Sequence, residues 1–147
     1  MIACIQRVSS ADVKVNGEVK GAIGAGLLVL LGVEKGDGTA NAKTLAEKTC
    51  NMRIFPDADG KMSLSVKDTG GEILIISQFT LAAETNKGNR PDFTNAAPPP
   101  LAENLYMEYI AFTKSIIGAE RVSVGIFAAN MQVSLVNDGP VTILIKK

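Results

Sequence analysis

Histidine is absent from the 147-residue sequence. A Ser-His-Asp or Cys-His nucleophile pair is therefore excluded, and so is an imidazole base that acts near neutral pH. An enzyme of this composition must rely on backbone N–H groups, hydroxyls, carboxylates, lysines or its own substrate. The missing histidine restricts the possible chemistry more than any other feature of the composition.

Cysteine is scarce as well. Cys4 and Cys50 stand alone, without a neighbour at the spacing of metal ligands. Neither a zinc site nor a disulfide framework is predicted from them. We expect no metal ion and no cofactor.

Long apolar runs and an excess of one charge are also lacking. The longest apolar run, Leu27 to Leu31, is far too short to cross a bilayer, and Met1 to Arg7 does not have the pattern of a signal peptide. Fifteen basic residues balance fifteen acidic ones, which argues against broad, sequence-blind coating of nucleic acid but leaves room for a small footprint on one end of an RNA. We therefore expect a cytoplasmic protein without a membrane or DNA partner.

What is present is the composition of a folded protein, with 46% apolar and 20% charged residues. The length predicts one domain over residues 1–147. Strand patterns open at Ile2 and continue through Val13 and Val15 to Asn16-Gly17, a pair that strongly predicts a hairpin turn. Further strands are predicted at residues 18–23, 26–33, 72–77, 121–125, 131–136 and 141–145.

Two helices are predicted between these strands. The first covers Ala40 to Met52, with Thr39 as its cap and with Ala42, Leu45, Ala46 and Cys50 on one face. The second begins at Pro98 and ends at Gly118. Its apolar face is expected to carry Leu101, Leu105, Tyr109, Phe112 and Ile116. The fold class is α/β, as a single domain with mainly antiparallel sheets and two main helices.

The segment Ser77-Gln78-Phe79-Thr80-Leu81 directly follows an apolar strand. A strand end is where backbone N–H groups leave the sheet, and such a group beside a hydroxyl can stabilise an oxyanion. The alternative is that Ser77 and Thr80 only satisfy a turn. The pattern alone leaves both interpretations open.

A second segment, Asn137-Asp138-Gly139-Pro140, lies between two strong strand patterns. A bond before proline has a reduced trans preference, so a cis Gly139-Pro140 bond in a tight turn is accessible and would fix the direction of two carbonyls. The alternative is an ordinary hairpin turn formed by Asn137 and Asp138.

Cations suggest where RNA would be contacted. Lys87 and Arg90 stand in a loop with Gly88, and Arg7 lies in the first strand. These side chains could bind phosphate, or the loop could be solvated and Arg7 could extend along the sheet surface.

Taken together, residues 77–81 and 137–142 resemble the two signature motifs of the D-aminoacyl-tRNA deacylases. The resemblance runs from end to end, at the family's usual length. It includes Ile5-Gln6-Arg7-Val8, Gly24 to Gly32, Arg53-Ile54-Phe55-Pro56, Gly60-Lys61-Met62 and Arg90-Pro91, in the family's order and spacing.

Four positions depart from the family pattern. Ala128 stands where the family often has glycine, and Asn130 where aspartate is common. Asn89 and Asp92 replace a frequent basic residue and a frequent serine in the loop around Arg90. They affect the expected RNA contact and the pocket rim, and they leave both signatures intact.

The resemblance implies a barrel-like core and an editing hydrolase that works as a homodimer. Its substrate would be the acceptor end of a tRNA that carries a D-amino acid, or glycine mischarged on alanine tRNA. The Gly-cisPro motif of one subunit would enter the pocket of the other and reject L-aminoacyl-tRNA.

The implied site draws on both motifs. Catalysis falls to Ser77, Gln78, Phe79 and Thr80, with the N–H groups around Phe79 and Thr80 on the carbonyl oxygen of the ester. Gly139 and Pro140 form the chirality filter. Substrate-binding positions are Leu81, Ala129, Met131 and Asn137, and possible RNA contacts are Arg7, Lys87 and Arg90. Two alternatives remain, namely a module that binds charged tRNA or a D-amino acid without hydrolysis, and a general small-ester hydrolase with a Thr80 nucleophile.

Overall fold

Strand β1 (Ile2–Val15) is the centre of the sheet, and the computed structural model describes residues 1–147. One edge of β1 pairs antiparallel with β8 (Gln132–Lys146) from Ile2 to Lys14. The other edge pairs antiparallel first with β3 (Gly26–Gly32) and then with β2 (Glu18–Ile23). Asn16 and Gly17 join β1 to β2 with φ values of 52° and 82°, which confirms the predicted hairpin turn.

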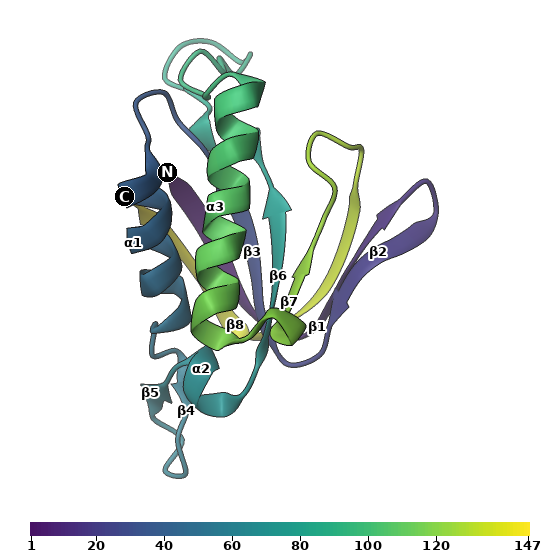
Figure 1. Cartoon of the computed structure of the whole chain (residues 1–147), viewed down its shortest axis with the longest axis vertical. Helices are drawn as coiled ribbons and strands as arrows, with labels where there is room; N and C mark the ends of the chain where they lie inside the picture. The colour runs from purple at the N-terminus through teal and green to yellow at the C-terminus, as the bar shows by residue number, and fades with distance from the viewer.

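The remaining pairs of the main sheet are parallel. Strand β3 pairs with β6 (Glu72–Ser77), and β6 pairs with β7 (Val122–Val124). Parallel neighbours need a long crossover, and helices α1 (Thr39–Cys50) and α3 (Pro99–Ile117) lie on the two connections. Figure 1 shows α1 and α3 side by side over one face of the sheet.

The sheet order β2-β1-β3-β6-β7 curls until its two ends almost meet. The Ser123 hydroxyl of β7 donates a hydrogen bond to the Ala22 carbonyl of β2 at 3.0 Å. A cluster of seven buried residues, including Val13, Leu28 and Leu74, fills the inside of this nearly closed barrel. A larger cluster of 24 buried residues lies between the sheet and the two helices. The predicted α/β, barrel-like arrangement is therefore confirmed.

Short elements complete the chain. A small hairpin of β4 (Phe55–Pro56) and β5 (Met62–Leu64) precedes the one-turn helix α2 (Val66–Thr69). Two 3₁₀ turns, η1 (Phe79–Ala82) and η2 (Ala119–Arg121), follow β6 and α3. No helix is long and apolar enough to cross a membrane.

Three sequence predictions about the elements need correction. Gly38, not Thr39, is the N-cap of α1, and Asn41 Oδ1 accepts a hydrogen bond from its N–H at 3.0 Å. Leu101 is exposed, because the first turn of α3 extends beyond the sheet, whereas Tyr106 and Ile110 are buried.

The third correction concerns the end of the chain. The two strands predicted at 131–136 and 141–145 are one strand, β8, and the chain does not reverse at Gly139-Pro140. Asn137 and Thr142 continue the same pairing with β1 on either side of that dipeptide. Residues 138–141 therefore form a bulge, not a hairpin turn.

Candidate active site

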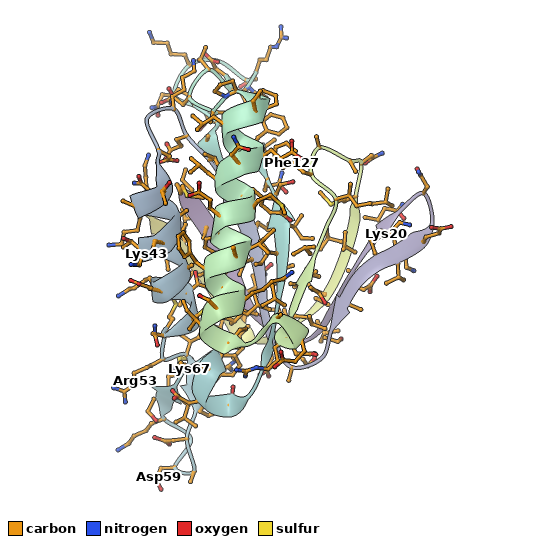
Figure 2. The ribbon with its side chains drawn as sticks, in the orientation of Figure 1. Lys20, Lys43, Arg53, Asp59, Lys67 and Phe127 are labelled. Carbon is orange, nitrogen blue, oxygen red and sulfur yellow. The ribbon has the colours of Figure 1, made fainter.

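An apolar cavity of about 600 Å³ opens at the carboxyl ends of the parallel strands β3 and β6. Fourteen of its 17 lining residues are hydrophobic, so it suits a flat or apolar ligand group better than a charged one. Its walls include the ends of β3 and β6 (Leu31, Val33, Ile76), the first turns of α3 (Pro99, Ala102, Tyr106) and the β7–β8 loop (Phe127, Ala128, Ala129). Figure 2 shows Phe127 beside the upper part of α3, on the side that faces this loop.

The polar part of the cavity is the predicted motif after β6. Ser77, Gln78 and Phe79 line the cavity. The Gln78 N–H donates to the Leu31 carbonyl at 2.8 Å, which joins the motif to the end of β3. The first hydrogen bond of the following 3₁₀ turn runs from Leu81 N to the Gln78 carbonyl at 3.3 Å. The N–H groups of Phe79 and Thr80 therefore lie outside the turn's own hydrogen bonds.

Two residues of the same motif do not line the cavity. The Thr80 hydroxyl is exposed and accepts a hydrogen bond from Gln78 Nε2 at 2.6 Å. Leu81 packs against Gly32, where an added Cβ would lie 3.0 Å from the Leu81 Cβ. Met131 and Ala129, predicted as substrate contacts, do lie on the cavity wall.

No side chain in the cavity can act as a base near neutral pH. Tyr106 is the one titratable lining residue, and its hydroxyl donates to the Ile75 carbonyl at 3.0 Å. Burial raises the pKa of Tyr106 to about 12, so the phenol keeps its proton. No group of three or more His, Cys, Asp or Glu side chains lies close enough to hold a metal ion. The cavity can position a ligand and donate hydrogen bonds, but it supplies no general base.

The rim of the cavity contains one residue with an unusual backbone conformation. Ala128 has a φ of 58°, in the left-handed region that costs a residue with a Cβ about 1–2 kcal/mol. Glycine adopts this conformation without that cost. The loop geometry thus explains physically why glycine suits this position better than alanine.

The Gly139-Pro140 bulge lies outside the cavity of its own chain. Along β1, Val8 pairs with Asn137 and Gln6 pairs with Thr142, so Arg7 alone faces residues 138–141. The Gly139–Pro140 bond is cis, and both residues are exposed. Asn137, predicted to bind substrate, uses its side-chain oxygen to accept from Val141 N at 2.9 Å and so closes the bulge from within.

The Arg7 side chain binds the bulge through Asp138. Arg7 Nε donates to the Asp138 carbonyl at 2.8 Å and lies 3.2 Å from Asp138 Oδ2. Arg7 Nη1 donates to the Ile54 carbonyl at 2.5 Å, and the guanidinium lies 6.0 Å from the centre of the Phe55 ring. Arg7 is only 8% exposed, so this structure places it as a support of the bulge and not as a surface contact for RNA.

The other two predicted RNA contacts are on the surface. Lys87 and Arg90 are exposed in the loop between Glu84 and Asp92, whose backbone groups pair at 2.8 and 3.0 Å. This loop precedes α3 and lies at the same end of the molecule as the start of that helix (Figure 1). Phe93, directly after it, lines the cavity.

Known proteins resemble this chain over nearly its whole length. The chain matches the family model described as D-Tyr-tRNA(Tyr) deacylase over residues 4–146. A D-aminoacyl-tRNA deacylase of Haemophilus influenzae is 61% identical over 142 residues, which cover 97% of this chain and 96% of that protein. One of Mannheimia succiniciproducens is 56% identical over 146 residues, 99% of each chain. The chain belongs to the D-aminoacyl-tRNA deacylase family.

Solved structures share the fold of this deacylase family member over its whole length. The c-Myc DNA unwinding element binding protein is 42% identical, with a TM-score of 0.96 over 100% of this chain and 99% of that one. A probable eukaryotic D-amino acid tRNA deacylase is 15% identical, with a TM-score of 0.85 over 98% of this chain and 97% of that one. At that identity, the second likeness shows the fold alone.

Three aromatic residues of the deacylase cavity were not predicted from the sequence. These residues are Phe93, in the loop before α3, Tyr106, within α3, and Phe127, in the β7–β8 loop. The ring centres of Tyr106 and Phe127 lie 5.8 Å apart, so the two side chains form one wall of the cavity. The helical spacing of Tyr106 after Ala102 was the one available sequence signal for a shared wall.

Proposed function

We propose that this deacylase hydrolyses the ester between a D-amino acid and the terminal adenosine of tRNA, in a site completed by a second copy of the chain. The observation that carries the proposal is the cavity itself, which is apolar except at Ser77 to Phe79 and contains no general base. Such a site suits a substrate that brings its own reactivity, because an aminoacyl ester is already activated and has a neighbouring 2′-hydroxyl.

The residues after β6 carry the chemistry in this proposal. The N–H groups of Phe79 and Thr80 stabilise the negative charge that develops on the ester oxygen, and Ser77 and Gln78 position the substrate. Thr80 is not the nucleophile in this proposal, because its hydroxyl bonds only to the Gln78 amide and no base accepts its proton. Positioning and oxyanion stabilisation supply the rate, and water attacks with help from the substrate.

A second copy of the chain is invoked because of strand β8. Its 15 residues pair with β1 on one edge and with no strand on the other. A long free edge invites pairing with another chain, and β8 also exposes the apolar side chains of Leu135, Val136 and Leu144. A homodimer covers this surface and places the exposed bulge of one chain against the cavity of its partner.

The bulge then acts as the chirality filter. The carbonyls of Gly139 and Pro140 occupy the space that an L side chain requires, so an L-aminoacyl ester meets a clash and two unpaired acceptors. A D side chain points away from them, and glycine has no side chain to reject. The enzyme therefore accepts many D-amino acids and also glycine mischarged on alanine tRNA, while Lys87 and Arg90 contact phosphates near the acceptor end.

The test compares three esters, D-tyrosyl-, L-tyrosyl- and glycyl-tRNA, at equal concentrations. We expect the D and glycyl esters to be hydrolysed at least about a hundredfold faster than the L ester, because the L side chain would clash with the bulge and leave buried acceptors unpaired. Release of D-tyrosine no faster than without protein would contradict the proposal and favour a module that only binds charged tRNA. Equal rates on D and L esters would favour a general ester hydrolase.

A further inference from the structure

Two aromatic rings stand exposed at the mouth of the cavity. Phe79 is 58% exposed and Phe93 is 38% exposed, although both side chains also line the cavity. Their ring centres are 5.2 Å apart and their planes meet at 67°. The two rings therefore form a corner and not a flat wall. A planar group that lies on the face of one ring meets the edge of the other, which is the favoured geometry of aromatic contacts.

Unpaired cations lie in the segments next to Phe93. Lys35, Lys87 and Arg90 are exposed, and none of them has a carboxylate within 4.0 Å. The nearby carboxylates are used locally, since Glu84 accepts from Asn86 N at 3.0 Å and Asp92 accepts from Thr94 N at 2.8 Å.

Lys35 belongs to the same surface as the loop. Its N–H donates to the Asn95 carbonyl at 2.9 Å, two residues after Phe93. The hydrogen bonds from Thr94, with the charge of Lys35, hold the pKa of Asp92 below its usual range. The mouth thus combines two exposed rings with three cations that have no ion-pair partner. Aromatic stacking surfaces beside cations are the pattern by which proteins bind single-stranded nucleic acid.

We propose that the Phe79–Phe93 pair stacks the base of the nucleotide that precedes the terminal adenosine of the tRNA, while Lys35, Lys87 and Arg90 contact the phosphates on either side of it. This inference rests on the proposed function, which places the terminal adenosine in the cavity. The chain of the RNA must then leave through the mouth, and the next base passes the only exposed rings there. Stacking on a ring face does not read the base edge, so the subsite gives affinity for the end of every tRNA.

Two non-hydrolysable ligands test this subsite. Each carries D-tyrosine on 3′-amino-3′-deoxyadenosine through an amide, with a preceding phosphodiester. One continues with cytidine and the other with an abasic ribose, so they differ in the base alone. The dissociation constants of both are measured for the wild-type protein, Phe93→Leu, and Phe127→Leu as a matched control inside the same cavity.

The wild-type protein is expected to bind the cytidine ligand roughly tenfold more tightly than the abasic one, within the range of base–aromatic stacking. Phe93→Leu should reduce this ratio to less than about twofold. Phe127→Leu should keep the ratio, whatever it does to both ligands together. Phe79→Leu provides a second variant of the pair, should Phe93→Leu fail to fold.

A wild-type ratio near one, or a ratio that stays tenfold in both Phe93→Leu and Phe79→Leu, would overturn the inference. Failure to bind either ligand would overturn it together with the placement of adenosine in the cavity. Hydrolysis is followed separately with the ester form of the cytidine ligand. Tenfold tighter binding of the cytidine ligand without hydrolysis would support the stacking subsite and contradict the proposed reaction. Hydrolysis with equal binding of the two ligands would support the proposed reaction and contradict the stacking subsite.

Discussion

Replacing Gly139 by alanine is expected to abolish most of the discrimination between D- and L-aminoacyl-tRNA. A Cβ at this position would lie 2.5 Å from Val141 N and 2.7 Å from Val141 Cγ2. The first contact is with backbone, so the bulge must move to relieve it. The carbonyls of Gly139 and Pro140 then no longer occupy the place of an L side chain. The ratio of kcat/KM for D-tyrosyl- over L-tyrosyl-tRNA should fall at least tenfold, or about 1.4 kcal/mol.

The control for this change is Gly38→Ala. Gly38 has an extended backbone, and no atom lies within 4 Å of the position of an added Cβ. The same substitution there should leave the D-to-L ratio unchanged. If Gly139→Ala also kept the wild-type ratio, the bulge would not be the filter.

Removing the Arg7 side chain is expected to have the largest effect on stability. Arg7→Ala leaves the buried Ile54 carbonyl without its donor and releases the Asp138 carbonyl from the guanidinium. Hydrogen bonds of charged groups contribute about 1.5–3 kcal/mol each, whereas the ion pair with the exposed Asp138 carboxylate adds little. The free energy of unfolding, measured by urea denaturation, should therefore fall by about 3 kcal/mol.

Arg53→Ala is the matched control for Arg7. Arg53 is exposed and donates one hydrogen bond, from Nε to the Ser63 carbonyl at 2.6 Å. Its removal should cost less than about 1 kcal/mol. A loss of similar size for both variants would show that Arg7 does not support the bulge in the way that its contacts indicate.

Sequence patterns within a few residues predicted the short strands and the first hairpin turn. The strands at 18–23 and 72–77 match the predicted bounds, and the Asn16-Gly17 turn has positive φ at both positions. The continuity of β8 was not predictable in this way. Asn-Asp-Gly-Pro has the composition of a turn, and only the pairing of Asn137 and Thr142 with β1 keeps the chain in one strand. That pairing joins residues more than 120 positions apart.

The site too was predicted only in the parts that depend on neighbouring residues. The pattern after the apolar strand left both a turn and a site open, and the family resemblance pointed to Ser77, Gln78 and Phe79. These residues line the cavity together with Met131 and Ala129. The burial of Arg7 could not be read from the sequence, because its partners are Ile54, 47 residues away, and Asp138, in a bulge that the sequence presented as a hairpin. The cavity mouth formed by Phe79 and Phe93 likewise depends on a loop that returns across the ends of the strands.

In the proposed dimer, the cavity of one chain and the Gly139-Pro140 bulge of another make one site, although they do not meet within a chain. Two variants separate these parts. Gly139→Ala disturbs the bulge and keeps the cavity, and Ala129→Trp fills the cavity from its wall and keeps the bulge. By itself, Gly139→Ala should hydrolyse both the D and the L ester, and Ala129→Trp should hydrolyse neither.

The decisive measurement refolds Gly139→Ala chains with about a tenfold excess of Ala129→Trp chains, so that nearly every intact cavity faces an intact bulge by mass action. We expect the mixture to regain rejection of L-tyrosyl-tRNA while it continues to hydrolyse D-tyrosyl-tRNA. A mixture that keeps the D-to-L ratio of Gly139→Ala alone would contradict the shared site.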